Sequence, residues 1–341
     1  MPTTIWFNKG FSSVYNVLAL IREGDAERRF RLLCSHTGNE FIGFAAADEA
    51  FVEPVPKSDE EYLAWCLKFC REHEVKLFIP ARRASFLARH AEMFEEAGTR
   101  ISVVCPDEFH HTIDNKGLCY DFCSNHGLPI PGYRMVKTLE QFDEAYAILK
   151  ENHKTVCFKP SVSVFGLGFK VLTESGREID RLLNGDVYKI GLEYARLIFG
   201  EQPSFRELMV MRYLEGNERS VDCLADHGNL LRHVIRKKSE HPGGAQILEE
   251  NEEISAMSRR LTSLFRLNGL YNIQFRESGG VPYLLEINPR MSGGIHYTCH
   301  SGLNLPYWGV CHAIGLCRED EIPLPTPGAK VGKVDTGVSV Q

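Results

Sequence analysis

An acid, an amide and a guanidinium lie close together at the end of one apolar run of this chain. The stretch 284-LLEINPR-290 places Glu286, Asn288 and Arg290 at intervals of two residues. Side chains two apart on a β-strand share a face, so Glu286 and Asn288 share one if 281–288 is a strand. Carboxylate and amide oxygens suit Mg²⁺, and a guanidinium beside them suits a phosphate group. A polar edge strand whose acid pairs with the arginine explains the same residues, so the rest of the chain must decide.

Two lysines stand where a phosphate group would need them. Lys159 ends the apolar run 155-TVCFKP-160 and precedes a loop of small residues. Its ammonium and the backbone N–H groups of that loop suit triphosphate oxygens. Lys116 follows an Asp-Asn turn at the start of a predicted helix, where a positive charge opposes the helix dipole. A surface lysine on a hairpin and a solvent-exposed helix start are the alternatives for these two residues.

These side chains need strands and helices to position them, and the first part of the chain alternates between the two. Apolar strand patterns occur at 3–7, 30–36, 75–80 and 100–106, and helical patterns at 14–23, 59–74 and 84–98. The alternation predicts a doubly wound α/β unit with a parallel sheet over residues 1–108. The first strand lacks the following G-x-G-x-x-G of dinucleotide-binding folds, which sets a dehydrogenase aside.

The remaining chain is predicted as two further parts, residues 109–205 and 206–341, which make the C-terminal half α+β in character. A loop is expected at 108–117, helices at 116–126, 138–152 and within 175–200, and a hairpin of 155–160 and 169–172 around loop 161–168. Later strands are expected at 207–214, 217–226, 229–238, 271–277 and 281–288, with helices at 252–269 and 302–317 and an edge strand within 328–341. Gly269 is the expected end of its helix.

The bulk composition describes an ordinary globular protein and narrows the function classes. A net charge of −6 and a pI near 6.1 give no electrostatic case for nucleic acid. No apolar run approaches the roughly 20 residues that span a bilayer, and the first residues do not read as a signal peptide. Eleven cysteines without a CxxC pair predict free thiols and a cytoplasmic location. The grouping of His296, Cys299, His300, Cys311 and His312 matches no zinc spacing, and packing explains it better.

Four stretches, taken in their order along the chain, resemble the ATP-grasp superfamily. They are IDNKGLCYDFCSNHGLPIPGY, CFKPSVSVFGLG, MRYLEGNERSVD and NIQFRESGGVPYLLEINPR, and the last is the specific one. In style they are similar to the branch of carbamoyl phosphate synthase large subunits and biotin carboxylases. The resemblance covers nearly the whole chain. It implies a pre-ATP-grasp domain at 1–108, a linker helix and mobile lid subdomain at 109–205, and an ATP-grasp subdomain with the Mg/ATP site at 206–341.

The resemblance also implies roles for individual residues. Phosphate-binding roles fall on Lys116, Lys159, Ser161, Ser163, Gly166 and Gly168, the last four in a mobile loop at 161–168. The adenine hinge falls on Met211, Arg212, Tyr213 and Leu214, with Glu218 on the ribose. Gln274, Glu286 and Asn288 are the implied Mg²⁺ ligands, with Mn²⁺ as the alternative metal, and Lys159 and Arg290 are implied to act on the transferring phosphoryl group. Leu167 and the pair Met211-Arg212 depart from the pattern of relatives.

The function implied is an ATP-dependent carboxylate–amine ligase that forms an acyl phosphate and releases ADP and phosphate. Its partners would be a small-molecule carboxylate and an amine, and a homodimer is common in the superfamily. Candidate substrate residues are Arg236, Lys238 and His241 for the carboxylate and Ser292, Gly293, Gly294 and His296 for the acceptor, with structural polarity as the alternative. An ATP-binding sensor or partner-binding protein and a small-molecule kinase are the competing hypotheses. Carbamoyl phosphate synthesis is less favoured, because that large subunit carries two such units, and biotin carboxylation would call for a carrier protein.

Overall fold

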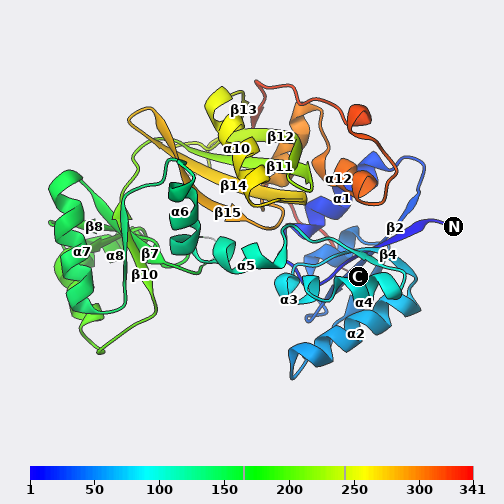
Figure 1. Cartoon of the computed structure of the whole chain (residues 1–341), viewed down its shortest axis with the longest axis horizontal. Coiled ribbons are helices and arrows are strands. Elements are labelled where there is room, and N and C mark those ends of the chain that lie inside the picture. The colour runs from blue at the N-terminus through cyan, green and yellow to red at the C-terminus, as the bar shows by residue number, and fades with distance from the viewer. Residues whose placement is uncertain (164–165, 242, 341) are drawn as a thin grey trace. The chain divides into compact units, whose positions relative to one another are not determined.

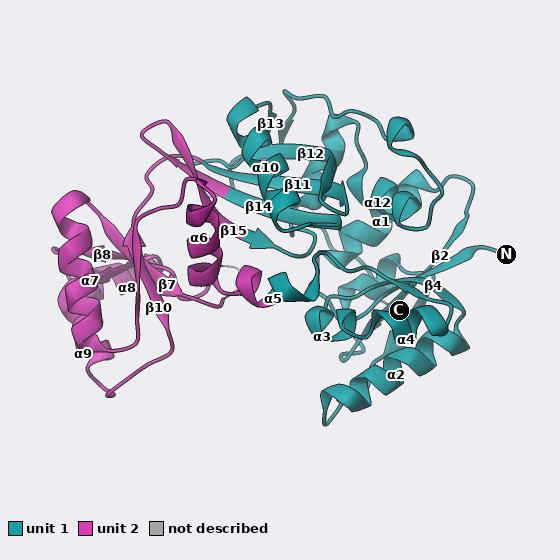
Figure 2. Cartoon of the chain, viewed as in Figure 1, with its two compact units in different colours: residues 1–110, 218–274, 287–341 teal, residues 111–217, 275–286 magenta. Residues whose placement is uncertain are grey.

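The computed structural model describes residues 1–163, 166–241 and 243–340 of the chain (Figure 1). The chain divides into two compact units, each built from segments that are distant in sequence (Figure 2). Unit 1 comprises Met1–His110, Glu218–Gln274 and Ile287–Gln341, and unit 2 comprises His111–Asn217 and Phe275–Glu286. The division after residue 110 lies close to the predicted one after residue 108. The three-part division as a whole stays a prediction.

Unit 1 begins with a parallel sheet in the order β3-β2-β1-β4-β5. Its strands are β1 (Thr3–Phe7), β2 (Phe30–His36), β3 (Glu49–Val52), β4 (Val75–Ile79) and β5 (Arg100–Ile101). Its helices are α1 (Val14–Gly24), η1 (Ile42–Ala46), α2 (Asp59–Glu72), α3 (Ala84–Ala88) and α4 (Ala91–Glu96). Ile5 and Phe7 of β1 are buried on the α1 side, whereas Trp6 is buried on the α2 side. The predicted doubly wound parallel unit is confirmed.

Three predictions in this region were wrong in detail. The helix expected at 84–98 is divided into α3 and α4, with His90 between them in a non-helical conformation. The strand expected at 100–106 already ends at Ile101, within β5. Where a loop was expected, Asp107–Asp114 forms α5. Two acidic residues in its first turn favour that helix through the helix dipole, a signal that the sequence reading overlooked.

Unit 2 is built around a mostly antiparallel sheet in the order β6-β10-β7-β8-β9. Its strands are β6 (Tyr133–Val136), β7 (Val156–Pro160), β8 (Lys170–Thr173), β9 (Lys189–Gly191) and β10 (Leu208–Arg212), and its helices are α6 (Lys116–Asn125), α7 (Leu139–Asn152), α8 (Glu178–Leu183) and α9 (Leu192–Phe199). β7 and β8 pair antiparallel, as the predicted hairpin requires. The helical region expected at 175–200 contains the strand β9, which pairs with β8. Tertiary pairing therefore overrides the helical pattern there.

The third sheet has the order β15-β14-β11-β12-β13-β16. Its strands are β11 (Glu218–Asp226), β12 (Asn229–Lys237), β13 (Gln246–Glu249), β14 (Gly269–Ser278), β15 (Val281–Asn288) and β16 (Lys330–Val331). The remaining helices are α10 (Glu252–Leu264), α11 (Ile295–Thr298), η2 (Cys299–Ser301), α12 (Leu305–Ala313) and η3 (Glu319–Glu321). The hairpin of β14 and β15 was predicted correctly, whereas β13 and α11 were missed.

Gly269 does not end a helix, as had been expected. α10 ends at Leu264, and Gly269 begins β14 with a φ of +65°. The helix expected at 302–317 is confined to Leu305–Ala313 because Asn304 caps its start, accepting a hydrogen bond from the Tyr307 N–H at 3.1 Å.

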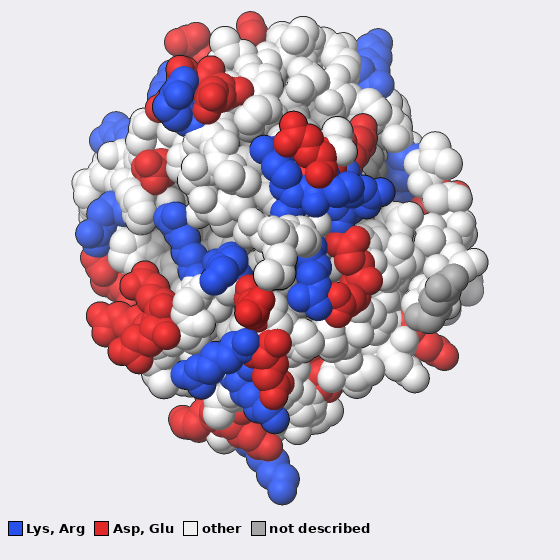
Figure 3. Space-filling model, turned by 90° about the vertical axis from the view of Figure 1, so that its right-hand side faces the viewer, with Lys and Arg blue, Asp and Glu red and all other residues white. Residues whose placement is uncertain are grey.

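On the face shown in Figure 3, Lys and Arg side chains are interspersed with Asp and Glu side chains. Among the described residues, none of the helices has both the length and the apolar character needed to cross a bilayer.

Candidate functional site

Lys116 lies in unit 2 at the first position of α6, where the residue is only 6% exposed. The Asn115 side chain caps this helix by accepting hydrogen bonds from the Gly117 and Leu118 N–H groups. Lys116 Nζ donates to the Ser163 carbonyl oxygen at 3.1 Å and lies 3.5 Å from Glu286 Oε2. The lysine that opposes the helix dipole is therefore an almost buried group paired with a carboxylate. It is not a solvated surface residue.

Lys159 lies on β7 in the same unit and is only 9% exposed. Its Nζ is 3.3 Å from Tyr120 Oη and 3.5 Å from the Leu285 carbonyl oxygen, and it stands 5.4 Å from the centre of the Tyr120 ring. Burial, with a smaller contribution from the nearby Lys116, lowers the pKa of Lys159 to about 8, and Glu286 partly offsets this. Two lysines thus share one carboxylate in a poorly hydrated place, an arrangement that an added anion would stabilise.

The small-residue loop after β7 begins against Lys116. The Lys116 N–H donates to the Ser161 carbonyl oxygen at 3.1 Å, and the Ser161 side chain is buried. Residues 164–165 of the predicted phosphate loop lie outside the described residues. Gly166 and Gly168 are exposed, and both have positive φ. A Cβ on Gly168 would also lie 2.8 Å from the Pro160 ring, so this position requires glycine.

The four predicted hinge residues lie at the end of β10 in unit 2. The side chains of Met211 and Leu214 are buried, at 3% and 2% exposure. The Arg212 N–H donates to the Gly132 carbonyl oxygen at 3.0 Å, and the Tyr213 N–H donates to the Thr155 carbonyl oxygen at 2.9 Å. The guanidinium of Arg212 instead stacks 4.4 Å over the Tyr283 ring. Met211 and Arg212 differ from the residues of the family pattern only in their side chains, which face the core and an aromatic ring. The backbone hydrogen bonds of the strand are kept.

In unit 1, two residues that had been given separate roles pair with each other. Glu218 begins β11 and forms an ion pair with Lys238, just after β12. The Lys238 N–H also donates to the Glu218 carbonyl oxygen at 2.9 Å. Both side chains are partly exposed, at 23% and 36%. Neither residue is locked in a core, so this pair can open to admit a ligand.

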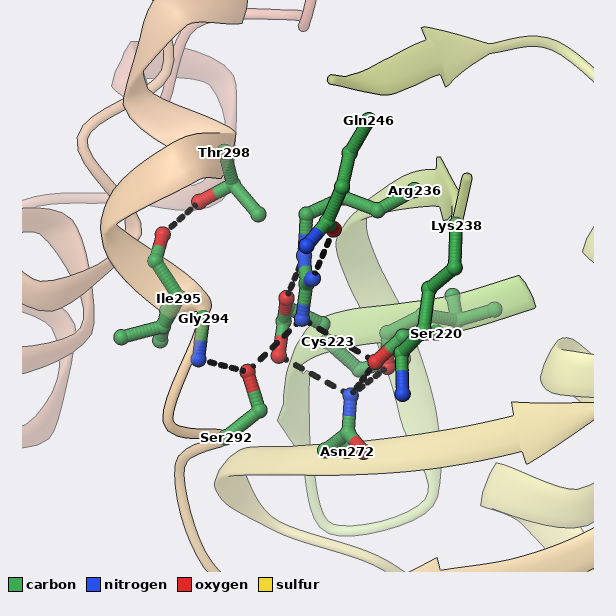
Figure 4. Close-up of polar contacts among 12 residues, drawn as sticks. Ser220, Cys223, Arg236, Lys238, Gln246, Asn272, Ser292, Gly294, Ile295 and Thr298 are labelled. Atoms are coloured by element: carbon green, nitrogen blue, oxygen red, sulfur yellow. Dashed lines mark hydrogen bonds and ion pairs between the residues drawn. The ribbon is translucent and has the colours of Figure 1, made fainter. Parts of the chain in front are cut away.

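Arg236 lies at the centre of a buried polar network of unit 1 (Figure 4). Its guanidinium donates to Asp222 Oδ2 at 2.8 Å, Gln246 Oε1 at 2.6 Å, Ser220 Oγ at 3.0 Å and Ser292 Oγ at 2.9 Å. Arg236 is 2% exposed and Asp222 is fully buried. These contacts occupy donors from all three guanidinium nitrogens. The arrangement favours a positioning role over direct contact with a substrate carboxylate, for which Arg236 stays a prediction.

The hydrogen-bond network around Arg236 extends to Asn288 and Arg290 of the stretch 284-LLEINPR-290. Asn272 on β14 donates to Ser220 Oγ at 2.9 Å and to Asp222 Oδ1 at 3.0 Å, and the Asn288 amide lies 3.5 Å from Asn272 Oδ1. Arg290 Nη2 in turn donates to Asn288 Oδ1 at 3.3 Å. A chain of hydrogen bonds therefore runs from the buried Asp222 to Arg290. Alternation along β14 places Gln274, which is partly buried, on the same face as Asn272.

The loop after Arg290 is held against the Arg236 guanidinium. Ser292 Oγ accepts both the Arg236 contact and a hydrogen bond from the Gly294 N–H at 3.2 Å (Figure 4). A Cβ on Gly294 would lie 2.7 Å from Arg236 Nη1, so a side chain there would displace the loop or the guanidinium. His296 Nδ1 lies 3.5 Å from Asn16 Nδ2, and burial together with the Arg236 charge lowers the pKa of His296.

Two other predicted residues lie apart from these contacts. Gly293 is exposed, and His241 is exposed in the loop between β12 and β13. Their predicted substrate roles stay predictions. All eleven cysteines are free thiols. Within the described residues, no group of three or more His, Cys, Asp or Glu side chains is arranged to hold a metal ion.

Sequence reasoning missed Tyr120, Ser220, Asp222 and Asn272. Ser220 and Asp222 lie two residues apart on β11. Asp222 is the lone acid of the otherwise apolar run 221-VDCLA-225, and that was a usable signal. Its partner Arg236 was singled out only as a substrate residue. Tyr120 sits among apolar residues of α6, and nothing in its local pattern indicates its contact with Lys159.

Comparisons with known proteins agree with this geometry. A family model described as ATP-grasp in the biosynthetic pathway with Ter operon matches residues 204–336. The carbamoyl phosphate synthase large chain of Thermus thermophilus is 26% identical over 322 residues, which cover 89% of this chain and 28% of that protein.

Two solved structures share the fold over nearly the whole chain. The ADP complex of N5-carboxyaminoimidazole ribonucleotide synthetase has a TM-score of 0.66 at 16% identity, covering 96% of this chain and 80% of the other. The L-amino acid ligase from Bacillus licheniformis has a TM-score of 0.62 at 16% identity, covering 95% of this chain and 77% of the other.

The fold and these matches define the class that the chain resembles, the ATP-grasp superfamily, and a family model of that class matches residues 204–336. Its sequence relatives within that class are carbamoyl phosphate synthase large chains, as the sequence resemblance implied. The chain spans only about a quarter of the length of these curated relatives.

Proposed function

We propose that this chain is an ATP-dependent carboxylate–amine ligase that releases ADP and phosphate. The observation that carries the proposal is the pair Lys116 and Lys159, both nearly buried around the single carboxylate of Glu286. Burying two ammonium groups with one carboxylate is costly unless a further anion completes the site. A triphosphate supplies that anion, and the relatives named above include a synthetase solved with ADP and an amino acid ligase.

The reaction proceeds in two steps. A carboxylate oxygen of the first substrate bonds to the γ-phosphorus of ATP, and the bond from that phosphorus to the β–γ bridging oxygen breaks, so ADP leaves. The amine of the second substrate then attacks the acyl carbon, phosphate leaves, and the nitrogen loses its proton to solvent. Lys159 and Arg290 neutralise charge on the transferring phosphoryl group. No oxidation or reduction takes place.

The proposed nucleotide-binding residues fall into three sets, for the phosphates, the adenine and the ribose. Lys116, Lys159, Ser161, Ser163, Gly166 and Gly168 bind the phosphates, the last four as part of a mobile loop. The backbone of Met211–Leu214 contacts the adenine, where the buried Met211 and Leu214 side chains hold the strand in place. Glu218 binds the ribose hydroxyls, which requires it to share or release Lys238.

The residues proposed as metal ligands fit Mg²⁺. Glu286 offers a carboxylate and Gln274 and Asn288 offer amide oxygens, and hard oxygen donors are what this cation prefers. A bound Mg²⁺ would neutralise phosphate oxygens, and Mn²⁺ would suit the same donors. The hydrogen bond from Arg290 Nη2 to Asn288 Oδ1 fixes the orientation of this amide.

The substrates would be held mainly by unit 1. Lys238 and His241 are proposed to meet the carboxylate, while Ser292, Gly293, Gly294 and His296 are proposed to meet the amine. Arg236 acts through Ser292 by fixing the loop that carries the acceptor residues. A cytoplasmic location is part of the proposal and is supported by the free thiols.

A homodimer is proposed through an exposed apolar face of unit 2, the α8–α9 face. It consists of Ile179, Leu182, Leu183, Val187, Tyr188, Tyr194, Leu197 and Ile198, each between 39% and 76% exposed. Exposed apolar surface of this extent marks an interaction site. The charged residues among 177–196 are Arg177, Glu178, Asp180, Arg181, Asp186, Lys189, Glu193 and Arg196, four of each sign. A balanced surface complements a second copy of itself better than it complements a strongly charged partner.

The proposal is tested by measuring ADP and phosphate release with ATP and Mg²⁺ in the presence of pooled carboxylic acids and amines. We expect one pool to stimulate release in the wild type and Glu286→Ala to abolish the stimulation. Glu201→Ala, an exposed carboxylate of the same unit, is the matched control and should keep it.

Other outcomes identify the alternatives. A phosphorylated substrate without an amide product indicates a kinase, and tight ATP binding without stimulated turnover by any pool indicates a sensor. Failure to bind ATP would leave only the fold assignment standing.

A further inference from the structure

A cavity in unit 1 lies at the carboxyl ends of the neighbouring strands β1 and β4. Phe7 and Asn8 line it after β1, and Ile79 and Pro80 line it after β4. In the order β3-β2-β1-β4-β5, the chain builds outward from β1 to β3 and then returns to the other side of β1 with β4. Open α/β sheets bind their ligands at such a switch point, outside the carboxyl ends of the strands.

The rim of the cavity is rigidly built by Asn8, which is only 1% exposed. Its Nδ2 donates to Tyr62 Oη at 2.9 Å and to the Arg82 carbonyl oxygen at 3.1 Å. Its Oδ1 accepts from the Ala81 N–H at 2.6 Å. The amide therefore ties the loop after β1 to the loop after β4. The Asn8 side chain therefore shapes the cavity, and both its polar atoms form hydrogen bonds within the protein.

The walls are mainly apolar and made of small side chains. Val14 and Val17 of α1, Ala84 and Ala88 of α3 and Leu270 of β14 all line the cavity. Its volume is about 110 Å³. An apolar protein cavity of about 150 Å³ holds a benzene molecule. This cavity therefore suits a short or branched aliphatic group and is too small for an aromatic ring.

One cation stands in this apolar wall. Among the described residues that line the cavity, Arg290 is the only Lys, Arg, Asp or Glu. Its guanidinium lies 5.5 Å over the Phe11 ring, and Nη1 donates to the Met291 carbonyl oxygen at 3.1 Å. Nη2 donates to Asn288 Oδ1 at 3.3 Å. The arginine thus connects the cavity to the strand end that carries a proposed metal ligand.

We infer that the cavity binds the carboxylate substrate, and that this substrate is a monocarboxylate with a compact aliphatic body. The aliphatic body of the substrate packs against the apolar walls of the cavity, and its carboxylate forms an ion pair with Arg290 at the side nearest Asn288. A second carboxylate would find no further Lys or Arg among the described residues that line the cavity. This inference rests on the proposed ligase function, because it makes the same carboxylate the group that ATP phosphorylates.

Binding is measured by calorimetry on the full chain, with 3-methylbutanoate, phenylacetate and succinate as probes and a non-hydrolysable ATP analogue with Mg²⁺ present. We expect 3-methylbutanoate to bind at least tenfold more tightly than either other acid. Ala84→Leu fills the cavity and should weaken that binding at least tenfold while leaving the affinity for the ATP analogue unchanged. Ala64→Leu, on the exposed face of α2, makes the same change outside the cavity and should alter neither.

A second variant keeps the test decisive if Ala84→Leu fails to fold. Val103→Ala enlarges the cavity and should raise the affinity for phenylacetate severalfold. Equal or tighter wild-type binding of phenylacetate or succinate overturns the inference, as does an unchanged affinity in both cavity variants.

The same samples separate this inference from the proposed function. Phosphate release is measured with each acid, ATP and a pool of amines. If 3-methylbutanoate binds in the cavity without stimulating release, the ligand class stands and the ligase proposal falls. If acids stimulate release equally in wild type and Ala84→Leu, the ligase proposal stands and the cavity assignment falls.

Discussion

At the scale of single residues, the structure separates side chains that act on a ligand from side chains that hold those residues in place. Lys159 is of the first kind, because it is buried with little compensation. Arg236 is of the second kind, because its donors end on Asp222, Ser220, Gln246 and Ser292. The sequence placed both residues near the site. Only the contacts distinguish them, since each is simply a cation on an apolar strand when read along the chain.

The burial of Lys159 predicts a gain of stability when its charge is removed. Lowering its pKa from the ordinary value of 10.5 to about 8 corresponds to a cost of about 3 kcal/mol at neutral pH. We expect Lys159→Met to raise the free energy of unfolding at pH 7 by about 1–3 kcal/mol, since the lost contacts to Tyr120 and Leu285 offset part of the gain. Nucleotide binding should be lost at the same time.

The lowered pKa of Lys159 also makes the stability of the folded chain depend on pH. Between about pH 8 and 10.5, the unfolded chain keeps the proton that the folded chain has released, so wild-type stability rises with pH in that window. The difference between wild type and Lys159→Met should therefore shrink from pH 7 to pH 10. Denaturant unfolding at the two pH values measures it, and a constant difference would contradict the explanation.

Two ion pairs of unit 1, one buried and one partly exposed, predict losses of stability of different size when the carboxylate is removed. Asp222→Ala leaves Arg236 buried without its partner and should destabilise the protein by about 3–5 kcal/mol. Glu218→Ala opens a partly exposed pair with Lys238 and should cost less than about 1 kcal/mol. Glu218→Ala should instead raise the KM for ATP, as expected for a ribose ligand. Thermal unfolding and steady-state kinetics on both variants decide this, and a stable Asp222→Ala protein would refute the positioning role of the network.

At the scale of elements, the helix α6 sets the position of Lys116 through its cap. Asn115 Oδ1 accepts from the Gly117 N–H at 2.9 Å and the Leu118 N–H at 3.2 Å. We expect Asn115→Ala to cost about 1–2 kcal/mol of stability and to weaken ATP binding several-fold, because the first turn that carries Lys116 loosens.

The cap of α7 provides the matched control for that prediction. Thr138 Oγ1 accepts from the Gln141 N–H at 3.3 Å in the same unit. Thr138→Ala should lower the melting temperature by a similar amount and leave the dissociation constant for ATP unchanged. If both variants weaken ATP binding equally, the effect comes from general loosening of unit 2, and the specific role of the α6 cap is lost.

Local sequence patterns predicted some of the helices and strands and missed others. Apolar runs or apolar periodicity predicted β1, α1, β7 and the hairpin of β14 and β15. β1 and β7 are buried along nearly their whole length, whereas α1 buries one face. The region 175–200 was predicted as helical, but β9 forms there because β8 offers a pairing edge. β13 was missed because four residues between β12 and α10 carry too short a pattern, and its pairing with β12 supplies the stability.

The residues of the candidate site also divide into those that local spacing predicts and those that it does not. Residues within one strand end, such as Glu286, Asn288 and Arg290, could be found from spacing alone. Contacts between elements, such as Lys159 with Tyr120 or Asp222 with Arg236, depend on which strands become neighbours. The cavity beside Arg290 is assembled from residues spread between Phe7 and Ala313, and no local pattern could indicate it.

At the scale of the whole molecule, the α8–α9 face is the feature that the monomer does not explain. Its side chains come from one short segment, and Leu182 and Leu183 are each 76% exposed. β9, within this segment, is also an edge strand of its sheet. Exposed apolar side chains beside a free sheet edge favour association, and the balanced charges of the segment favour a second copy of the same chain.

We therefore expect the wild type to sediment as a dimer at micromolar concentration and Leu182→Glu to sediment as a monomer with its fold retained. Burying a charge in the apolar contact would cost several kcal/mol of association free energy, enough to raise the dimer dissociation constant by at least a hundredfold. Leu324→Glu is the control, because Leu324 is equally exposed at 76% but lies in unit 1, outside this face. Analytical ultracentrifugation of the three proteins decides the matter. A monomeric wild type, or a dimer that Leu182→Glu leaves intact, would mean that this face does not join two copies of the chain.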